Sequence, residues 1–208
     1  MIPIDVLLVF FSAAIALALV PGPDNIFVLT QSAVHGRMAG LVVTLGLVSG
    51  LIVHTTAVAF GVAVIFQTSQ YAFTALKYAG AAYLLYLAWG AFRASSSKFG
   101  GEAAQAETVP RQYARGFIMN VANPKVTIFF LAFLPQFVDP ARGAIIPQFF
   151  LLGTFMMIAS LLVFGTVALA AGSLGAWLKG SPRTQVWLNR VSGLVFVALA
   201  LKLATAER

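Results

Sequence analysis

Two short motifs place proline beside a charged residue inside long apolar stretches of the sequence. The first is Pro21-Gly22-Pro23-Asp24-Asn25, and the second is Asn123-Pro124-Lys125. Proline removes a backbone donor and clashes with the preceding helical turn, so a helix must kink or unwind at each motif. Charged groups among apolar residues are costly and usually mark a substrate or ion pathway. The motifs therefore predict two broken helices that carry a site for a charged ligand.

The charges of Asp24 and Lys125 allow two arrangements of that site. The two side chains could form an ion pair, because a buried charge needs a partner. Alternatively, Asp24 could bind the ammonium group of a substrate and Lys125 its carboxylate, which suits a zwitterionic amino acid. Both could hold in turn, with the substrate displacing the pair. The structural alternative for both motifs is a kink that only serves packing.

Three further polar residues accompany the motifs. Asn25 is expected to cap the helix that resumes after the first break, whose positive N-terminal end would attract a carboxylate. Asn120, one turn before Asn123, could add a polar face to the site or hydrogen-bond a neighbouring helix. His54 lies in an otherwise uncharged stretch and could relay protons with Asp24. A neutral histidine bonded to a neighbouring helix is the favoured alternative for His54.

The composition is that of a membrane protein. The chain has 208 residues, of which 60% are hydrophobic and 9% are charged, whereas about 25% of residues in soluble domains are charged. Several uncharged stretches exceed the roughly 20 residues that cross a bilayer as a helix, and isolated strands cannot satisfy their backbone groups in lipid. We predict an all-α polytopic membrane protein with six transmembrane helices, at 5–33, 40–67, 71–92, 114–138, 144–172 and 186–204.

The remaining composition argues against several other classes of protein. The 13 basic residues behind the net charge of +7 are spread over short loops, which fits residues flanking membrane spans better than a nucleic-acid surface. Cysteine is absent, so disulfides and thiol chemistry are excluded. Asp24 is the lone acid deep within a predicted span, and no serine stands in a nucleophile elbow. We therefore predict neither enzyme activity nor a cofactor.

The two motifs sit at corresponding places in two halves of the chain. Aligning Pro23 with Pro124 also aligns Asp24 with Lys125, and apolar residues follow both. We predict two three-helix repeats, 1–92 and 114–208, whose first helices (helices 1 and 4) are broken by proline. Because three is odd, the second repeat must run inverted through the membrane. Residues 93–113, rich in Ser, Ala, Gly and Glu, are expected to form a linker.

Two patterns bear on orientation and association. Loops with more lysine and arginine face the cytoplasm, and the loops after the first, third and fifth spans hold more of them than the other side. We expect a cytoplasmic 93–113 linker and periplasmic termini. Gly36 with Gly40 and Gly46 with Gly50 form two G-x-x-x-G pairs that predict close helix packing. Contact with the broken first span is the favoured use of these pairs, and a homodimer interface is the alternative.

These motifs together resemble those of the lysine exporter and homoserine/threonine resistance (LysE/RhtB) family of amino-acid exporters. The resemblance covers most of the chain and includes the residues 21–25, Gly36-Arg37, Gly40, Lys77-x-x-Gly80, Gly116-Phe117, Asn120, 123–125 and 134–137. It implies a secondary transporter that exports amino acids or related small metabolites across the bacterial inner membrane. The implied driving force is the proton motive force, so protons are expected partners of the transporter. Membrane lipid is the other expected partner, since the helices cross the membrane.

Two other functions remain as alternatives. A metal-ion exporter of related architecture would need clustered His, Cys, Asp or Met ligands, whereas the chain has two separated histidines and an isolated Met156-Met157 pair. We therefore predict no metal site. A membrane scaffold is the other alternative. Among amino-acid substrates, a dicationic one is less expected, because a second carboxylate would be needed to neutralise it in a low dielectric.

Overall fold

The computed structural model describes residues 2–20, 22–68, 70–93, 108–180 and 182–205, and these ranges contain helices and no strands. The α-helices are α1 (Ile4–Leu19), α2 (Pro23–His35), α3 (Arg37–Thr68), α4 (Gln70–Arg93), α5 (Val109–Val121), α6 (Pro124–Ile128), α7 (Ile145–Gly180) and α8 (Pro182–Thr205). A π-helical turn, η1 (Phe129–Phe133), and two 3₁₀ turns, η2 (Leu134–Phe137) and η3 (Pro140–Arg142), connect α6 to α7. The all-α prediction is confirmed.

Both predicted breaks are present. Helices α1 and α2 form the first broken span, with a bend of 61°, and α5 with residues 124–137 forms the second, with a bend of 48°. Pro23 opens α2 and Pro124 opens α6. Proline is tolerated at a first helical position because the N–H it lacks has no partner there in any case. Pro21 lies outside the described residues.

The described helices fit a membrane protein. Residues Arg37–Gly61 of α3 and Ile145–Ala171 of α7 have mean hydropathies of 2.0 and 2.2, and each broken span is long and apolar enough to cross a bilayer. Helices α4 and α8 stand where the third and sixth spans are expected, and the total of six spans stays a prediction. Helix α5 begins at Val109, inside the predicted linker, because Pro110 sits in its first turn.

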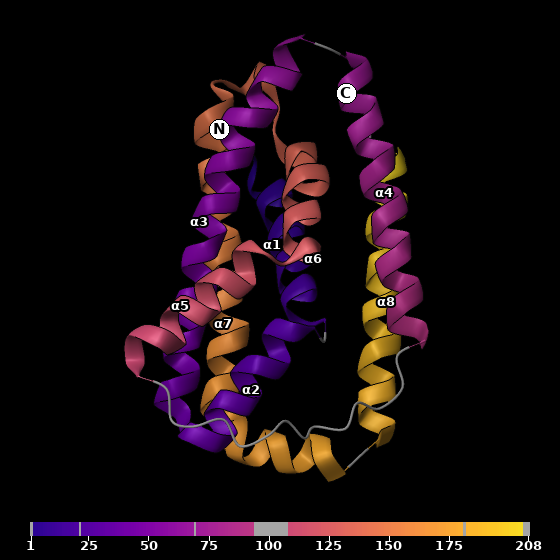
Figure 1. The fold of residues 1–208 in the computed structure, drawn as a ribbon. Helices are drawn as coiled ribbons and strands as arrows, with labels where there is room; N and C mark the ends of the chain where they lie inside the picture. The colour runs from indigo at the N-terminus through magenta and orange to yellow at the C-terminus, as the bar shows by residue number, and fades with distance from the viewer. Residues whose placement is uncertain (1, 21, 69, 94–107, 181, 206–208) are drawn as a thin grey trace.

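The two broken spans run in opposite directions through the bundle (Figure 1). Helix α1 starts at the end of the molecule where α8 finishes, whereas α5 starts toward the opposite end. The second broken span packs on α3, the first packs on α7 and, through α2, also on α3, and α4 pairs with α8. This crossed pairing agrees with an inverted repeat, although the correspondence of residues 1–92 with 114–208 stays a prediction.

A row of phenylalanines forms the centre of the core. The rings of Phe129, Phe133 and Phe137 follow one another along the second broken span, with 4.9 Å between successive centroids. Phe10 of α1 packs edge-on against Phe137 at 5.1 Å. Such aromatic pairs add roughly 0.5–1.5 kcal/mol each beyond the area they bury. The row therefore holds α1 and the second broken span together, between the breaks and the end of the molecule where α1 starts.

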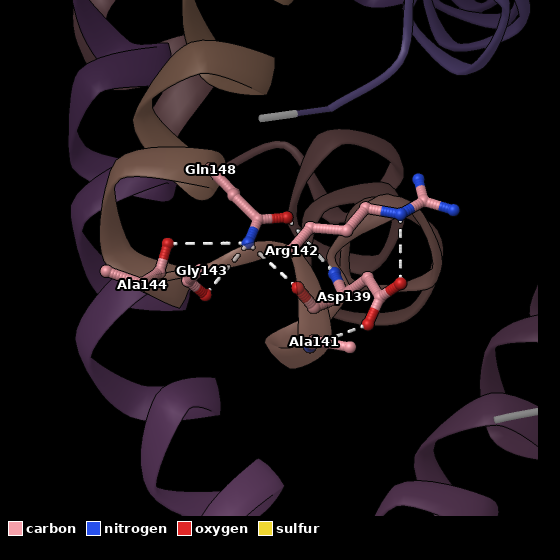
Figure 2. Close-up of polar contacts among 6 residues, drawn as sticks. All are labelled: Asp139, Ala141, Arg142, Gly143, Ala144 and Gln148. Atoms are coloured by element: carbon pink, nitrogen blue, oxygen red, sulfur yellow. Dashed lines mark hydrogen bonds and ion pairs between the residues drawn. The ribbon is translucent and has the colours of Figure 1, made fainter.

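The connection before α7 is fixed by one side chain that the sequence did not single out (Figure 2). Gln148 donates from Nε2 to the backbone oxygens of Asp139 (2.9 Å) and Gly143 (3.2 Å), and its Oε1 accepts from the Asp139 N–H (3.1 Å). The Asp139 carboxylate accepts from the Ala141 N–H and pairs with Arg142 at 2.9 Å. Gln148 thereby ties the end of the second broken span to the first turn of α7.

Glycines bring α3 and α5 into backbone contact. A Cβ at Gly46 would collide with the backbone oxygen of Tyr113, and one at Gly116 would collide with the Val43 oxygen. A Cβ at Gly50 would lie 2.6 Å from Oδ1 of Asn120. The expectation that the glycines of α3 pack on the first broken span is met at Gly40, where a Cβ would collide with Ser32 of α2, and was wrong for Gly46 and Gly50. Helix α5, from the second, covers this pair, which is therefore unavailable as a homodimer interface.

We predict that Gly46→Ala destabilises the protein, whereas Gly61→Ala on the same helix does not. Nothing lies within 4 Å of a Cβ at Gly61, and overpacking of a close contact costs typically about 1–3 kcal/mol. Thermal unfolding of the two variants in the same detergent measures the difference. Equal midpoints would contradict the close α3–α5 packing.

Candidate functional site

The two breaks meet at a hydrogen bond between Asn123 and Asp24. Nδ2 of Asn123 donates to Oδ2 of Asp24 over 2.7 Å. Asp24 is only 1% exposed and Asn123 only 4% exposed, so bulk water does not reach this contact. The bond joins the first turn of α2 to the start of α6, and it is the direct link between the two predicted motifs.

Asn123 also caps the helix that follows it. Its Oδ1 accepts from the backbone N–H of Lys125 over 3.0 Å, which is the N-cap arrangement that asparagine commonly forms. The amide therefore uses its oxygen for α6 and its nitrogen for Asp24. Because both ends of the amide are engaged, Asn123 holds the carboxylate of Asp24 in a fixed position relative to α6.

Asn25 does not have the capping role that we expected. The N-cap of α2 is Gly22, which has no side-chain cap bond. Nδ2 of Asn25 instead donates to the backbone oxygen of Ala18 over 2.8 Å. The physical reason is position, because Asn25 already lies inside α2 and helical side chains lean toward the N-terminus. Asn25 thus reaches back across the break to the last turn of α1.

Lys125 reaches from the second break to the first. Its side chain is 8% exposed, and Nζ lies 3.4 Å from the backbone oxygen of Val20. Asp24 and Lys125 attract each other electrostatically. A Cβ at Gly22 would lie 3.1 Å from Nζ, so a larger residue there would crowd the ammonium group. The break in the first span therefore leaves both a free carbonyl and the space that Lys125 needs.

His54 binds the backbone at the second break. Its Nε2 lies 3.1 Å from the backbone oxygen of Asn120, the oxygen that would accept from residue 124 in an unbroken helix. Pro124 has no N–H to donate. A carbonyl can only accept, so Nε2 carries the hydrogen of this bond. The contact matches the alternative of a histidine bonded to a neighbouring helix, and a proton-relay role stays a prediction.

A small buried cavity lies at the centre of the site. Its volume is about 10 Å³, and its polar lining includes Asp24, Asn120 and Lys125, which leaves room for about one water molecule. Oδ1 of Asp24 and Oδ1 of Asn120 have no hydrogen-bond partner. Buried polar atoms are rarely left unpaired. The two acceptors therefore offer a place for a hydrogen-bond donor beside the Lys125 ammonium group.

Helix α7 completes this cavity with residues that the sequence analysis missed. Met156, Ser160 and Phe164 form its far wall. These residue types are ordinary in an apolar membrane helix, so their types alone gave no signal. Their spacing of four residues places them on one face of α7, but only the packing of α7 on the first broken span shows which face is turned to the site.

A larger and more open pocket approaches the two breaks from outside. It has a volume of about 430 Å³, and its lining includes Pro23, Asn123 and Pro124. Arg115 also lines it, with the guanidinium group 5.0 Å from the centre of the Phe27 ring. The volume of this pocket falls within the range of small-molecule sites, and Asn123 borders the pocket on one side while bonding Asp24 on the other.

These features define a class of protein. Paired broken helices that meet at a buried charged site within an apolar bundle are characteristic of secondary transporters. Among the residues that the structure describes, no group of three or more His, Cys, Asp or Glu side chains could hold a metal ion. The predicted site residues Gly22, Asp24, Asn120, Asn123 and Lys125 are brought together around the cavity or at its edge.

Comparison with known proteins identifies the family. The chain belongs to the LysE type translocator family, which matches residues 15–207. A homoserine/homoserine lactone efflux protein of Salmonella typhimurium is 33% identical over 191 residues, which cover 92% of each chain. A leucine efflux protein of Salmonella choleraesuis is 31% identical over 201 residues, covering 95% of this chain and 94% of the relative. No solved structure matches the chain significantly. The family resemblance is thereby confirmed.

We predict that Asn123→Ser and Asn123→Ala separate the two roles of Asn123. Serine retains an N-cap oxygen but is too short to reach Asp24, whereas alanine loses both interactions. A lost cap costs typically about 1 kcal/mol, and a buried charged acceptor left without its donor costs roughly 1–3 kcal/mol. Thermal unfolding should therefore rank wild type above Asn123→Ser and Asn123→Ser above Asn123→Ala. Equal stability of wild type and Asn123→Ser would contradict a strong bond to Asp24.

Proposed function

We propose that this protein is a secondary transporter that exports an amino acid or a related small zwitterionic metabolite across the bacterial inner membrane. The observation that carries the proposal is the meeting of Asp24 and Lys125 at one buried cavity, from two broken helices. The names of the relatives, which describe efflux of homoserine, homoserine lactone and leucine, support the same substrate class.

The site offers a complementary group to each end of a zwitterion. Oδ1 of Asp24, which has no partner, can accept a hydrogen bond from the substrate ammonium group. The Lys125 ammonium group can leave the Val20 oxygen, a long bond of 3.4 Å, and bind the substrate carboxylate. Without substrate, the Lys125 ammonium group lies near enough to attract the Asp24 carboxylate, without a direct ion pair between the two. The exchange keeps every buried charge compensated, which avoids the cost of several kcal/mol for an isolated one.

The structure corresponds to a closed state in this scheme. A cavity of about 10 Å³ cannot hold an amino acid, so the helices around it must separate for binding. The two breaks are the natural hinges, because backbone at a helix break can absorb a change of φ and ψ. Movement of α2 or α6 about its break would join the buried cavity to one side of the membrane at a time, which is alternating access.

Proton coupling follows from competition at one carboxylate. Asp24 can hold either a proton or a substrate ammonium group, but a protonated acid no longer attracts that cation. Entry of a proton from the periplasm would therefore favour release of substrate, and loss of that proton to the cytoplasm would restore the binding charge. His54 is a second candidate for carrying protons. The proton motive force is then the energy source of export.

The proposed orientation places the termini in the periplasm and residues 93–113 in the cytoplasm. Seven lysine and arginine residues follow the first, third and fifth predicted spans, against four on the other side, and such residues are retained in the cytoplasm. The association of two copies into a homodimer stays a prediction. Any homodimer would use a surface other than Gly46 and Gly50, since α5 covers them.

We predict that Asp24→Asn and Lys125→Ala each reduce export from cells by at least roughly tenfold, because each leaves a buried charge without its partner. The assay follows the efflux of radiolabelled homoserine, threonine, leucine and lysine, and export of the neutral amino acids should exceed export of lysine. Asp139→Asn is the matched control, because this carboxylate is half exposed in the η3 connection. Normal export by both site variants would refute the zwitterion site.

We predict that a pH gradient, acidic on the periplasmic side, drives amino-acid movement by wild-type protein in proteoliposomes. Any residual transport by Asp24→Asn should continue down the substrate gradient but should no longer respond to the pH gradient, since the amide cannot exchange a proton. A pH-gradient response in Asp24→Asn equal to that of wild type would assign coupling to another group, and His54→Gln tests the second candidate in the same assay.

A further inference from the structure

One face of α2 carries a line of polar side chains that begins at the proposed zwitterion site and continues beyond it. Asp24, Gln31 and His35 are spaced by seven and four residues, so they lie on one face of the helix. Each has a buried polar atom without a hydrogen-bond partner, namely Oδ1 of Asp24, Oε1 of Gln31 and Nε2 of His35. Gln31 is only 4% exposed. We call these three residues the α2 polar stripe.

The α2 polar stripe lies along an apolar seam. Val28, on the same face, packs in one cluster with Val43 and Leu47 of α3 and with Val163 and Ala168 of α7. Between residues 145 and 171, α7 contains no charged residue or histidine. Apolar side chains therefore border the stripe around Val28, and beyond Asp24 no hydrogen-bond partner meets Oε1 of Gln31 or Nε2 of His35. Polar atoms retained in such a place indicate a second conformation in which they meet water or ligand.

Helix α2 is built to move as a unit. It is bounded by Gly22, which is fully extended, and by Gly36, whose φ of 88° is readily adopted by glycine. Backbone freedom is thus concentrated at both ends of a 13-residue helix, which is the usual arrangement of a hinged element. A swing of α2 away from α3 and α7 would expose the stripe over its whole length, from the connection at residues 36–37 to Asp24.

We propose that the α2 polar stripe lines the passage between the zwitterion site and the end of the bundle at residues 36–37. When the seam opens, Gln31 and His35 hydrogen-bond water and the polar groups of the amino acid as it moves to or from Asp24. The proposal rests on the proposed function. It assigns substrate contacts to two residues that neither the motifs nor the closed cavity includes, and it names the seam that opens on this side.

The test uses the natural absence of cysteine from the chain. Gln31→Cys is labelled in membrane vesicles of both orientations with a membrane-impermeant methanethiosulfonate that carries a trimethylammonium group. Arg37→Cys reports which vesicle face carries the 36–37 connection. Two controls are Ile26→Cys, on the other side of α2, and Ala59→Cys, at a position of α3 that is 0% exposed and belongs to another core cluster.

We expect Gln31→Cys to react from the same face as Arg37→Cys and at least about tenfold faster than Ala59→Cys, since local opening sets the reaction rate of a buried group. Ile26→Cys, surrounded by lipid or protein, should stay slow. Equal rates for Gln31→Cys and Ala59→Cys would overturn the proposal. So would fast labelling of Ile118→Cys, which lines the outer pocket, with none at residue 31, because the passage would then follow that pocket.

A second variant keeps the proposal testable if Gln31→Cys does not fold. Gln31→Leu removes an unpaired buried polar group, so it should keep or raise the thermal stability while slowing amino-acid export. If Gln31 had only a structural role, Gln31→Leu would lower the thermal stability. Export per amount of folded protein would then be unchanged. Labelling needs no knowledge of the substrate, so absence of export of every amino acid would refute the proposed function alone.

Discussion

The structure depends on a shortage of hydrogen-bond donors at the two helix breaks. Each break leaves backbone oxygens without their usual helical donors, and the bilayer interior supplies no water to satisfy them. The protein meets the need with side chains from the site itself. Asn25 donates to the Ala18 oxygen and Lys125 reaches the Val20 oxygen. His54 donates to the Asn120 oxygen, which also accepts from the Asn123 N–H. The residues that hold the breaks open are thus the same residues that could bind a ligand.

This shared duty links binding to conformation. A ligand that takes Lys125 away from the first break also removes a donor from its free backbone oxygen, so binding changes the stability of the break itself. A ligand can shift a conformational equilibrium only through such a difference in its interactions with the two states. The close approach of Gly22 to the Lys125 ammonium group makes this dependence direct, since any shift of Nζ changes the packing at the hinge of α2.

The sequence predicted the breaks and the residues of the site better than their contacts. Proline and charge within apolar stretches have strong local causes, and these located Asp24 and Lys125 without a structure. The partners of Asn25 and of the Gly46–Gly50 pair depend on which helices cross, which no local pattern records. Gln31 and His35 gave no signal for a related reason. An i, i+4 pair of polar residues looks like a solvent-facing surface until the packing of α2 against α3 and α7 is known.

The Gln148 contacts give the two halves of the molecule different mechanical roles. Gln148 fastens the far end of the second broken span to α7 by several hydrogen bonds, whereas α2, in the first, lies between two glycines. The second broken span is therefore held in place at its far end, whereas α2 of the first is free to swing about its two ends. If α2 swings as proposed, the two faces of the bundle would open unequally, by a swinging helix on one side and by a stiffer rearrangement on the other. Two broken spans of similar design need not move alike.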